Sequence, residues 1–268
     1  MRLSVVTDEI DEDLARALDV CSDLGITVVE IRSVDGKNIV EHTTKSIAGI
    51  QRMLSDQGVR VCAIAAPFLK CEANSDLDLA WRDFERSIRT ARKLGAPLVR
   101  AFSFWRADDP RSVFPKLIPI LRSAASVATG AGLRLAIENE HSCNVATGDE
   151  AAAIVRACRP ASLGVIWDPA NEARYSPAAA SGVAGYIAIR EQVAHVHMKD
   201  VDAAGNWIRV GAGIVDHRAL LTALRRDGYE GCVSVETHYT VDGSREAATR
   251  ECVSALRTIW PSKNSGAF

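Results

Sequence analysis

The strongest constraint on this chain is a repeating alternation of short β-rich runs and longer helical segments. Eight apolar runs rich in Val and Ile span residues 3–6, 26–31, 59–65, 97–102, 133–138, 163–167, 193–198 and 232–236. The segments between them carry the apolar spacing of amphipathic helices, for example at 11–25, 77–95, 113–132, 149–158, 217–228 and 244–260. Strands that alternate with helices pair in parallel through right-handed crossovers.

The number of units favours a closed barrel. Eight strand–helix units need about 250 residues, and the chain has 268. TDEID follows the first run, where a dinucleotide-binding fold would carry a Gly-rich phosphate loop. We therefore predict the α/β class and a single-domain (β/α)8 TIM barrel over residues 1–262, with a tail at 263–268.

Several helix boundaries are also marked. Glycine accepts the positive φ that commonly ends a helix. It stands just before the next strand at four places, Gly25, Gly58, Gly95 and Gly132. Asp149 and Asp216 are predicted helix N-caps, because their side chains accept hydrogen bonds from free backbone N–H groups.

Charge and composition exclude several function classes. The formal net charge is −2 and no run of five basic residues occurs, which disfavours a nucleic-acid partner. No stretch reaches the ~18 apolar residues of a membrane span, and MRLSVVTDEIDEDL lacks the pattern of a signal peptide. The seven cysteines include no CxxC pair. They are typical of free thiols in a reducing compartment, so we expect a cytoplasmic protein.

Ionisable residues cluster at the predicted strand ends, where TIM barrels place their active sites. Strand five ends in Glu138, strand six in Asp168 and strand eight in Glu236, while strand seven carries His195 and His197. If the alternating faces point inward, three carboxylates and at least one imidazole converge at one mouth. Carboxylates that close together need a cation. The donor set suits Mn²⁺, Mg²⁺ or Co²⁺ and tolerates Zn²⁺.

Four motifs in this order and spacing carry a family resemblance. AIEN ends strand five, IWDPAN strand six, HVHMKD strand seven and SVETH strand eight. The pattern resembles the xylose isomerase-like barrels, and more narrowly the sugar phosphate isomerase/epimerase group with its ketose 3-epimerases, hydroxypyruvate isomerase and inosose dehydratase. TDEI at 7–10, EIRSVDGKN at 30–38 and APFLKC at 66–71 extend the resemblance over nearly the whole chain.

The resemblance implies a set of site residues. One divalent cation, with Mn²⁺ expected first, would be held by Glu138, Asp168, His197 and Glu236. Glu138 and Glu236 would also be the catalytic acid/base pair. His195 would support the site or contact the substrate. The other implied substrate contacts are Lys199, Arg100, Lys70, Asn171 and His238.

Two positions depart from the ketose 3-epimerases, which carry a His and a Glu where this chain has Asn171 and Asn144. Both positions bind substrate in those enzymes. The departures weaken the case for ketose 3-epimerase specificity and leave the metal set intact.

The implied function is a metal-dependent isomerase or epimerase acting on a small hydroxyketone or sugar. It would remove a C–H proton and stabilise the enediolate on the metal. The alternative is a lyase of the same fold that eliminates a group from an inosose, a dehydroshikimate or a 3-keto-sugar. An abasic-site DNA endonuclease is a remote alternative, because the chain has six His and none in strand three. A non-catalytic barrel is disfavoured by the intact ligand set. A homodimer or homotetramer is the oligomeric expectation that the resemblance leaves open.

Overall fold

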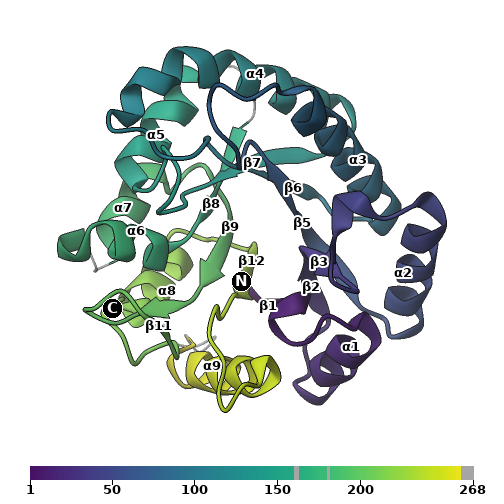
Figure 1. The fold of residues 1–268 in the computed structure, drawn as a ribbon. Coiled ribbons are helices and arrows are strands. Elements are labelled where there is room, and N and C mark those ends of the chain that lie inside the picture. The colour runs from purple at the N-terminus through teal and green to yellow at the C-terminus, as the bar shows by residue number, and fades with distance from the viewer. Residues whose placement is uncertain (160–162, 180–181, 261–268) are drawn as a thin grey trace.

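The computed structural model describes residues 1–159, 163–179 and 182–260. Eight parallel strands close into a barrel in the order β1-β12-β9-β8-β7-β6-β5-β2, and helices form a ring around it (Figure 1). The barrel strands are β1 (Arg2–Val6), β2 (Val28–Ile31), β5 (Arg60–Phe68), β6 (Leu98–Ala101), β7 (Arg134–Glu138), β8 (Leu163–Trp167), β9 (Val193–Met198) and β12 (Cys232–Val235). The predicted single-domain (β/α)8 barrel is confirmed. The predicted domain end at 262 and the tail at 263–268 lie outside the described residues.

The helices follow the strands as the sequence pattern predicts. The α-helices are α1 (Leu14–Asp23), α2 (Thr44–Asp56), α3 (Asp78–Leu94), α4 (Phe114–Gly130), α5 (Gly148–Ala157), α6 (Pro169–Tyr175), α7 (Val183–Ile189), α8 (His217–Arg226) and α9 (Arg245–Ile259). Short 3-10 turns lie at η1 (Thr7–Glu9), η2 (Ile39–Glu41), η3 (Pro110–Val113) and η4 (Pro177–Ala179). No helix of the described residues is long and apolar enough to cross a membrane.

The boundary predictions are mostly confirmed. The four predicted glycines all adopt positive φ, between 61° and 77°. Asp216 caps α8 by accepting from the Ala219 N–H at 2.9 Å. The cap at Asp149 is wrong, because Thr147 caps α5 and Glu150 completes a reciprocal capping box with it.

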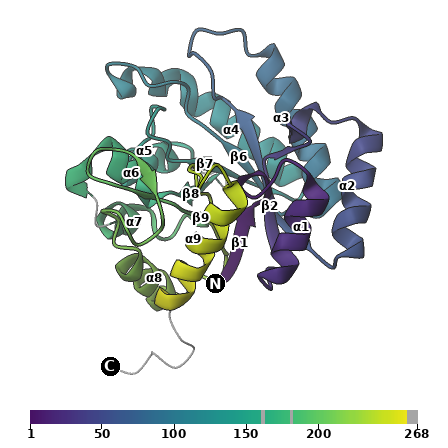
Figure 2. The ribbon, with the colours of Figure 1, turned by 60° about the horizontal axis from the view of Figure 1, so that its bottom comes forward.

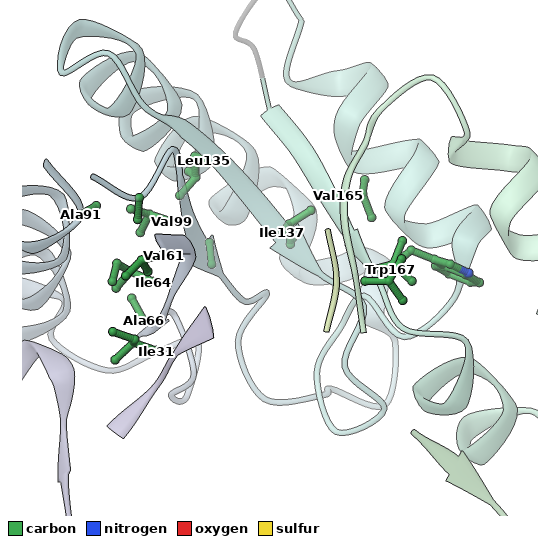
Figure 3. Close-up of a cluster of buried hydrophobic side chains, with 14 of the residues drawn as sticks. Ile31, Val61, Ile64, Ala66, Ala91, Val99, Leu135, Ile137, Val165 and Trp167 are labelled. Atoms are coloured by element: carbon green, nitrogen blue, oxygen red, sulfur yellow. The ribbon is translucent and has the colours of Figure 1, made fainter. Parts of the chain in front are cut away.

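The main core lies between the outer face of the barrel and the helices. Alternate strand residues supply it, and Figure 3 shows Val99, Leu135, Ile137 and Val165 at this layer, all fully buried. The other strand faces point into the barrel, where a smaller apolar cluster contains Val28, Cys62, Ala63, Leu98, Ala136, Ile166 and Cys232. This alternation also directs the ionisable strand-end residues inward.

The two ends of the described chain lie side by side (Figures 1 and 2). β1 pairs with β12, and the register sets Arg2 opposite Cys232. Two ion pairs join the following helices: Arg16 of α1 reaches Glu246 at 3.1 Å, and Arg250 of α9 reaches Asp23 at 2.8 Å. The last strand–helix unit therefore closes the barrel against the first.

Two antiparallel hairpins follow barrel strands at the carboxyl end of the barrel. β3 (Ser33–Val34) and β4 (Lys37–Asn38) follow β2, while β10 (Asp200–Val201) and β11 (Trp207–Ile208) follow β9. The second hairpin brings the Trp207 ring to 5.1 Å from the Lys199 ammonium. The two hairpins therefore lie beyond the carboxyl ends of the barrel strands.

The backbones of α5 and α7 approach each other unusually closely. A Cβ on Gly148 would lie 2.1 Å from the carbonyl oxygen of Gly185. A Cβ on Gly185 would lie 2.4 Å from both carboxylate oxygens of Glu172. Both positions therefore require glycine because of space.

Glu172 is a buried carboxylate with incomplete hydrogen bonding. Its Oε1 accepts from the Gly148 N–H at 2.9 Å, while Oε2 has no hydrogen-bond partner among the described residues. Burial raises the pKa of Glu172 to about 7, against the lowering effect of the Gly148 hydrogen bond. The folded state therefore binds this proton more tightly than the unfolded chain does.

We expect Glu172→Gln to stabilise the protein in a pH-dependent way. A raised carboxyl pKa makes the wild type lose stability as pH rises from about 4.5 to about 7, and Gln has no proton to lose. The variant should match the wild type near pH 4.5 and exceed it by on the order of 2 kcal/mol at pH 8. Urea unfolding at both pH values measures this difference. The exposed Glu230→Gln is the control, and an equal gain at both pH values would contradict the assignment.

Candidate metal centre and active site

Four residues predicted as metal ligands meet at the carboxyl end of the barrel. Glu138 ends β7, Asp168 follows β8, His197 lies in β9 and Glu236 follows β12. Each offers one donor atom, and these atoms lie within 4.8 Å of one another. His197 Nδ1 lies 3.1 Å from Glu138 Oε1, 3.4 Å from Glu236 Oε2 and 3.9 Å from Asp168 Oδ2. All four side chains are buried, so one imidazole and three carboxylates converge away from bulk water.

Asp168 directs one oxygen into this cluster. It is the N-cap of α6, and its Oδ1 accepts from the N–H groups of Ala170 and Asn171, both at 2.9 Å. Asn139, which directly follows β7, fixes the Asp168 backbone. Its side-chain Oδ1 accepts from the Asp168 N–H, and its Nδ2 donates to the Asp168 C=O. Asp168 Oδ2 is buried and lacks a hydrogen bond of good geometry, although the Lys199 Nζ lies 2.9 Å away. A buried carboxylate oxygen that lacks a hydrogen bond and faces three other potential ligand atoms suits a cation.

Glu30 of β2 orients His197 from beneath. Its carboxylate lies 3.1 Å from His197 Nε2 and 2.8 Å from His195 Nε2, and Ser234 Oγ lies 2.9 Å from the same His195 nitrogen. Burial alone would raise the pKa of Glu30, but the two imidazoles hold it well below its usual value. This arrangement leaves His197 Nδ1 facing the cluster. A carboxylate that fixes the outer nitrogen is the usual support of a metal-bound histidine.

Glu138 is held in place by a buried arginine. Arg100 Nη1 donates to Glu138 Oε2 at 2.9 Å, and its other nitrogens donate to the carbonyls of Ala65 and Ala66. Burial would raise the pKa of Glu138, but His197 and Arg100 outweigh it and lower the pKa. Glu138 therefore stays ionised, with Oε1 directed at His197.

Two cations hold Glu236. Lys199 Nζ donates to Oε2 at 2.7 Å, and Arg32 Nη1 donates to Oε1 at 2.8 Å. Burial would raise the pKa of Glu236, but Lys199 and the neighbouring His238 and His197 hold it well below its usual value. Lys199 is itself fully buried, and Asp168 and Glu236 raise its pKa against the opposing effect of burial. Both catalytic glutamates predicted from sequence are therefore anions in this arrangement.

Two further groups of ligand-type residues share members with this cluster. In the first, Glu30 with His195 and His197, the donor atoms already bond to each other. In the second, Glu9 with Glu236 and His238, the Arg32 guanidinium bridges the two carboxylates at 2.6 Å and 2.8 Å. Neither of these two groups contains a buried ligand-type atom without a hydrogen bond, such as Asp168 Oδ2 in the four-residue cluster.

A cavity of about 260 Å³ opens above the cluster at the carboxyl ends of the strands. Trp105 and Trp207 contribute to its walls, and Glu236 contributes to its floor. Five of the six residues predicted to contact substrate also line it: Lys70, Arg100, Asn171, Lys199 and His238. Its volume is near the lower end of small-molecule sites.

The substrate-contact residues differ in how firmly they are held. Lys70 pairs with Glu140 at 3.1 Å, and Asn171 donates to the Asn139 carbonyl at 2.9 Å. His238 lies 3.4 Å from Glu236 Oε1 and is partly exposed. His195 is the exception, because it is buried beneath the cluster and is not among the residues that line this cavity.

Asn144 has a structural role in its loop. Its side-chain amide donates to the carbonyls of Ser103, Phe104 and Trp105, and its Oδ1 accepts from the Ala107 N–H at 2.9 Å. It is fully buried and outside the cavity lining. The position that binds substrate in ketose 3-epimerases therefore braces the loop that carries Trp105 here.

Sequence reasoning missed several functional neighbours. Glu30, Arg32, Glu140, His141 and Trp207 were not predicted as site residues, although each contacts the cluster or lines the cavity. The ionisable pair Glu30 and Arg32 stands at a strand end like the predicted ligands, and that signal was available. Nothing in the spacing of Trp207 indicates that a hairpin folds back over the mouth.

The barrel agrees with the comparison to protein families. The family model described as Xylose isomerase-like TIM barrel matches residues 18–259. The chain therefore belongs to the xylose isomerase-like TIM barrel family. No curated protein matches the chain.

Solved structures show the same fold. The probable 3-DHS dehydratase AsbF from Bacillus anthracis has a TM-score of 0.77 at 14% identity, covering 98% of this chain and 100% of its own. The IOLI protein with a bound zinc atom has a TM-score of 0.77 at 18% identity, with 97% and 98% covered. The D-allulose 3-epimerase from Methylomonas sp. has a TM-score of 0.76 at 14% identity, with 97% and 98% covered. At these identities the likeness shows the fold alone.

Proposed function

We propose that this protein is a divalent-metal-dependent isomerase or epimerase that acts on a small hydroxyketone or sugar. Glu138, Asp168, His197 and Glu236 would hold the ion. The observation that carries the proposal is the buried group of four donor atoms within 4.8 Å, in which Asp168 Oδ2 lacks a hydrogen bond. Oxygen donors with one imidazole suit Mn²⁺, Mg²⁺ or Co²⁺ and accept Zn²⁺, and we expect Mn²⁺ first. The zinc atom named for the IOLI protein is consistent with such a centre.

The bound ion would supply Lewis-acid stabilisation of the negative charge that develops on the substrate oxygens. Glu138 and Glu236 would move the protons. Because both are ionised, either can accept a proton from a carbon next to a carbonyl. In an isomerisation the glutamate that took the proton would return it to the adjacent carbon, and in an epimerisation the other glutamate would first take a proton from solvent and then deliver it on the opposite face. Arg100 and Arg32 hold the two carboxylates in fixed orientations.

The cavity above the cluster supports a small polar substrate. Lys70, Asn171, Lys199 and His238 give its wall a polar lining. Trp207 restricts the mouth near Lys199. A volume of about 260 Å³ suits a single sugar or a molecule of that size. His195 lies below, so we assign it to support of Glu30 in place of substrate contact.

A metal-dependent lyase is the second candidate. The observation that favours it concerns the two positions that bind substrate in ketose 3-epimerases. Here the Asn144 side chain is hydrogen-bonded to carbonyls of its own loop region, and the Asn171 side chain is hydrogen-bonded to the Asn139 carbonyl. The buried Lys199 ammonium beside Glu236 would place a positive charge near a departing hydroxyl. The fold likeness to AsbF is consistent with this reading.

Proton exchange tests the proposal. The metal-stripped protein should show no exchange of substrate C–H protons with D₂O by NMR over a panel of ketoses, keto-acids and 3-keto-sugars. Restoring Mn²⁺, Mg²⁺, Co²⁺ or Zn²⁺ should start the exchange. A rearranged product would assign an isomerase or epimerase, and an unsaturated, UV-absorbing product would assign a lyase. A protein that binds no metal would contradict both readings.

Glu30→Gln tests the support of the metal centre directly. We expect its affinity for Mn²⁺ or Zn²⁺ to fall about 10- to 100-fold, because His197 loses the carboxylate that fixes its outer nitrogen. Isothermal titration of the folded variant measures this loss without a substrate. The exposed Glu191→Gln is the control. Unchanged affinity in Glu30→Gln would remove Glu30 from the centre.

A further inference from the structure

The barrel contains a second cavity at the end opposite the proposed metal centre. It has a volume of about 590 Å³. Its lining includes residues at the beginnings of barrel strands, such as Arg2, Val28, Arg60, Leu98 and Arg134. Nothing in the proposed reaction uses this space, and its volume is within the range of small-molecule sites.

The cavity exists because the lower barrel is filled with small side chains. Barrel interiors are normally packed by layers of bulky branched residues. Here Gly164 supplies no side chain, and a Cβ at that position would lie 2.7 Å from Arg134 Nε and 2.9 Å from Ala194 Cβ. Glycine therefore makes room for the Arg134 guanidinium beneath the barrel. The Arg134 side chain therefore packs into space that the absence of a side chain at Gly164 leaves open.

Arg134 is half-buried and forms no ion pair with a carboxylate among residues 1–159, 163–179 and 182–260. Its Nη2 donates to the Gln192 carbonyl at 3.1 Å, while its Nε is buried without a hydrogen-bond partner in the described part of the chain. Burial lowers the pKa of Arg134, and no carboxylate offsets this effect. Uncompensated guanidinium groups favour anions.

The formal charge of the cavity is positive among its described lining residues. Arg2, Arg60 and Arg134 line it, and no Asp or Glu does. Cys232 also lines the cavity, and its surroundings lower the pKa of its thiol. The hydrogen bond from Cys62 lowers the pKa of Cys232 to about 6 against burial, with help from the charges of His195 and Arg2. The cavity is therefore electropositive next to an apolar wall that includes Val61 and Leu98.

We propose that this cavity is a binding site for a small organic anion, a carboxylate on a short apolar body. The carboxylate would pair with Arg134, with Arg2 and Arg60 at the rim. The apolar body would lie against Val28, Val61 and Leu98. An apolar wall and a fixed guanidinium together select such a ligand over a bare inorganic ion or a neutral alcohol.

Isothermal titration of the intact protein with hexanoate tests the site, with hexanol and inorganic phosphate as comparators. We expect hexanoate to bind at least about tenfold more tightly than either comparator, because only hexanoate satisfies both features of the site. Arg134→Met should reduce hexanoate affinity at least about tenfold. The exposed Arg92→Met on α3 is the matched control and should leave it unchanged. Equal binding of hexanol, equal binding of phosphate, or no hexanoate binding would each overturn the proposal.

A second measurement covers the case in which Arg134→Met fails to fold. Cys232 should react with iodoacetamide at pH 7 in the wild type, because its pKa is about 6. Saturating hexanoate should slow this alkylation several-fold, as followed by mass spectrometry of the Cys232 peptide, and hexanol should not. Alkylation of the partly exposed Cys71, remote from the cavity lining, should be unaffected. An unprotected Cys232 would contradict occupancy of the cavity.

Discussion

Replacing Glu236 by Gln should reduce metal-dependent C–H exchange by about 10²- to 10⁴-fold. The amide keeps the size of the side chain but can no longer accept the proton. Glu138→Gln should have a similar effect, because the two carboxylates reach the same cluster from the ends of different strands. Exchange of substrate protons with D₂O measures both variants on any substrate that the wild type exchanges.

The control for these variants must separate chemistry from folding. Glu236 also pairs with Lys199 and Arg32, so its replacement removes two buried ion pairs. Thermal unfolding identifies a variant that is inactive because it does not fold. Glu191→Gln, at an exposed position, should retain wild-type exchange. Full exchange in folded Glu236→Gln and folded Glu138→Gln would remove both residues from the proton-transfer steps.

Gly148→Ala should destabilise the protein by about 3 kcal/mol or more. The added Cβ would lie 2.1 Å from the Gly185 carbonyl oxygen and 2.4 Å from its Cα, and backbone cannot move aside as a flexible side chain does. Urea unfolding measures the loss of unfolding free energy. Helices α5 and α7 would have to move apart to relieve the clash.

Gly49→Ala in α2 is the matched comparison. A Cβ at Gly49 meets nothing within 4 Å, so the alanine should stabilise the helix by about 0.5–1 kcal/mol. The two substitutions add the same methyl group to helical glycines and should differ in sign. A mild effect at Gly148 would show that α5 and α7 do not pack as closely as the structure has them.

The sequence predicts the fold because each strand–helix unit repeats the same local signals. Residues 135–137 and 163–167 are apolar, and each stretch is followed at once by a carboxylate, Glu138 or Asp168. That abrupt change indicates the carboxyl end of a barrel strand. The α5 boundary was misplaced although the signal was present: Thr147 and Glu150 stand three residues apart as a capping box. The short α6 and α7 carry too few residues for a clear helical period.

The site could be predicted only where a metal-ligand type of residue stands at the end of a recognisable strand. The contact of Glu30 with His195 joins residues 165 positions apart, and no local pattern records such a pairing. Lys199 and Arg100 are predicted from the sequence as substrate contacts. In the structure their charges are engaged by Glu236 and Glu138, because burial at this depth requires a partner for each charge.

The origin of the site residues along the chain has a kinetic consequence. Glu138, Asp168, His197 and Glu236 all belong to the second half of the chain, whereas Glu30, Arg32 and Arg100, which orient them, belong to the first. Contacts between residues so far apart in sequence form late in folding, because closing the long intervening loop costs conformational entropy. The β1–β12 pairing completes the ring. A nascent chain therefore holds the orienting residues before it has any of the ligands, and the capacity to bind the ion tightly arises together with barrel closure.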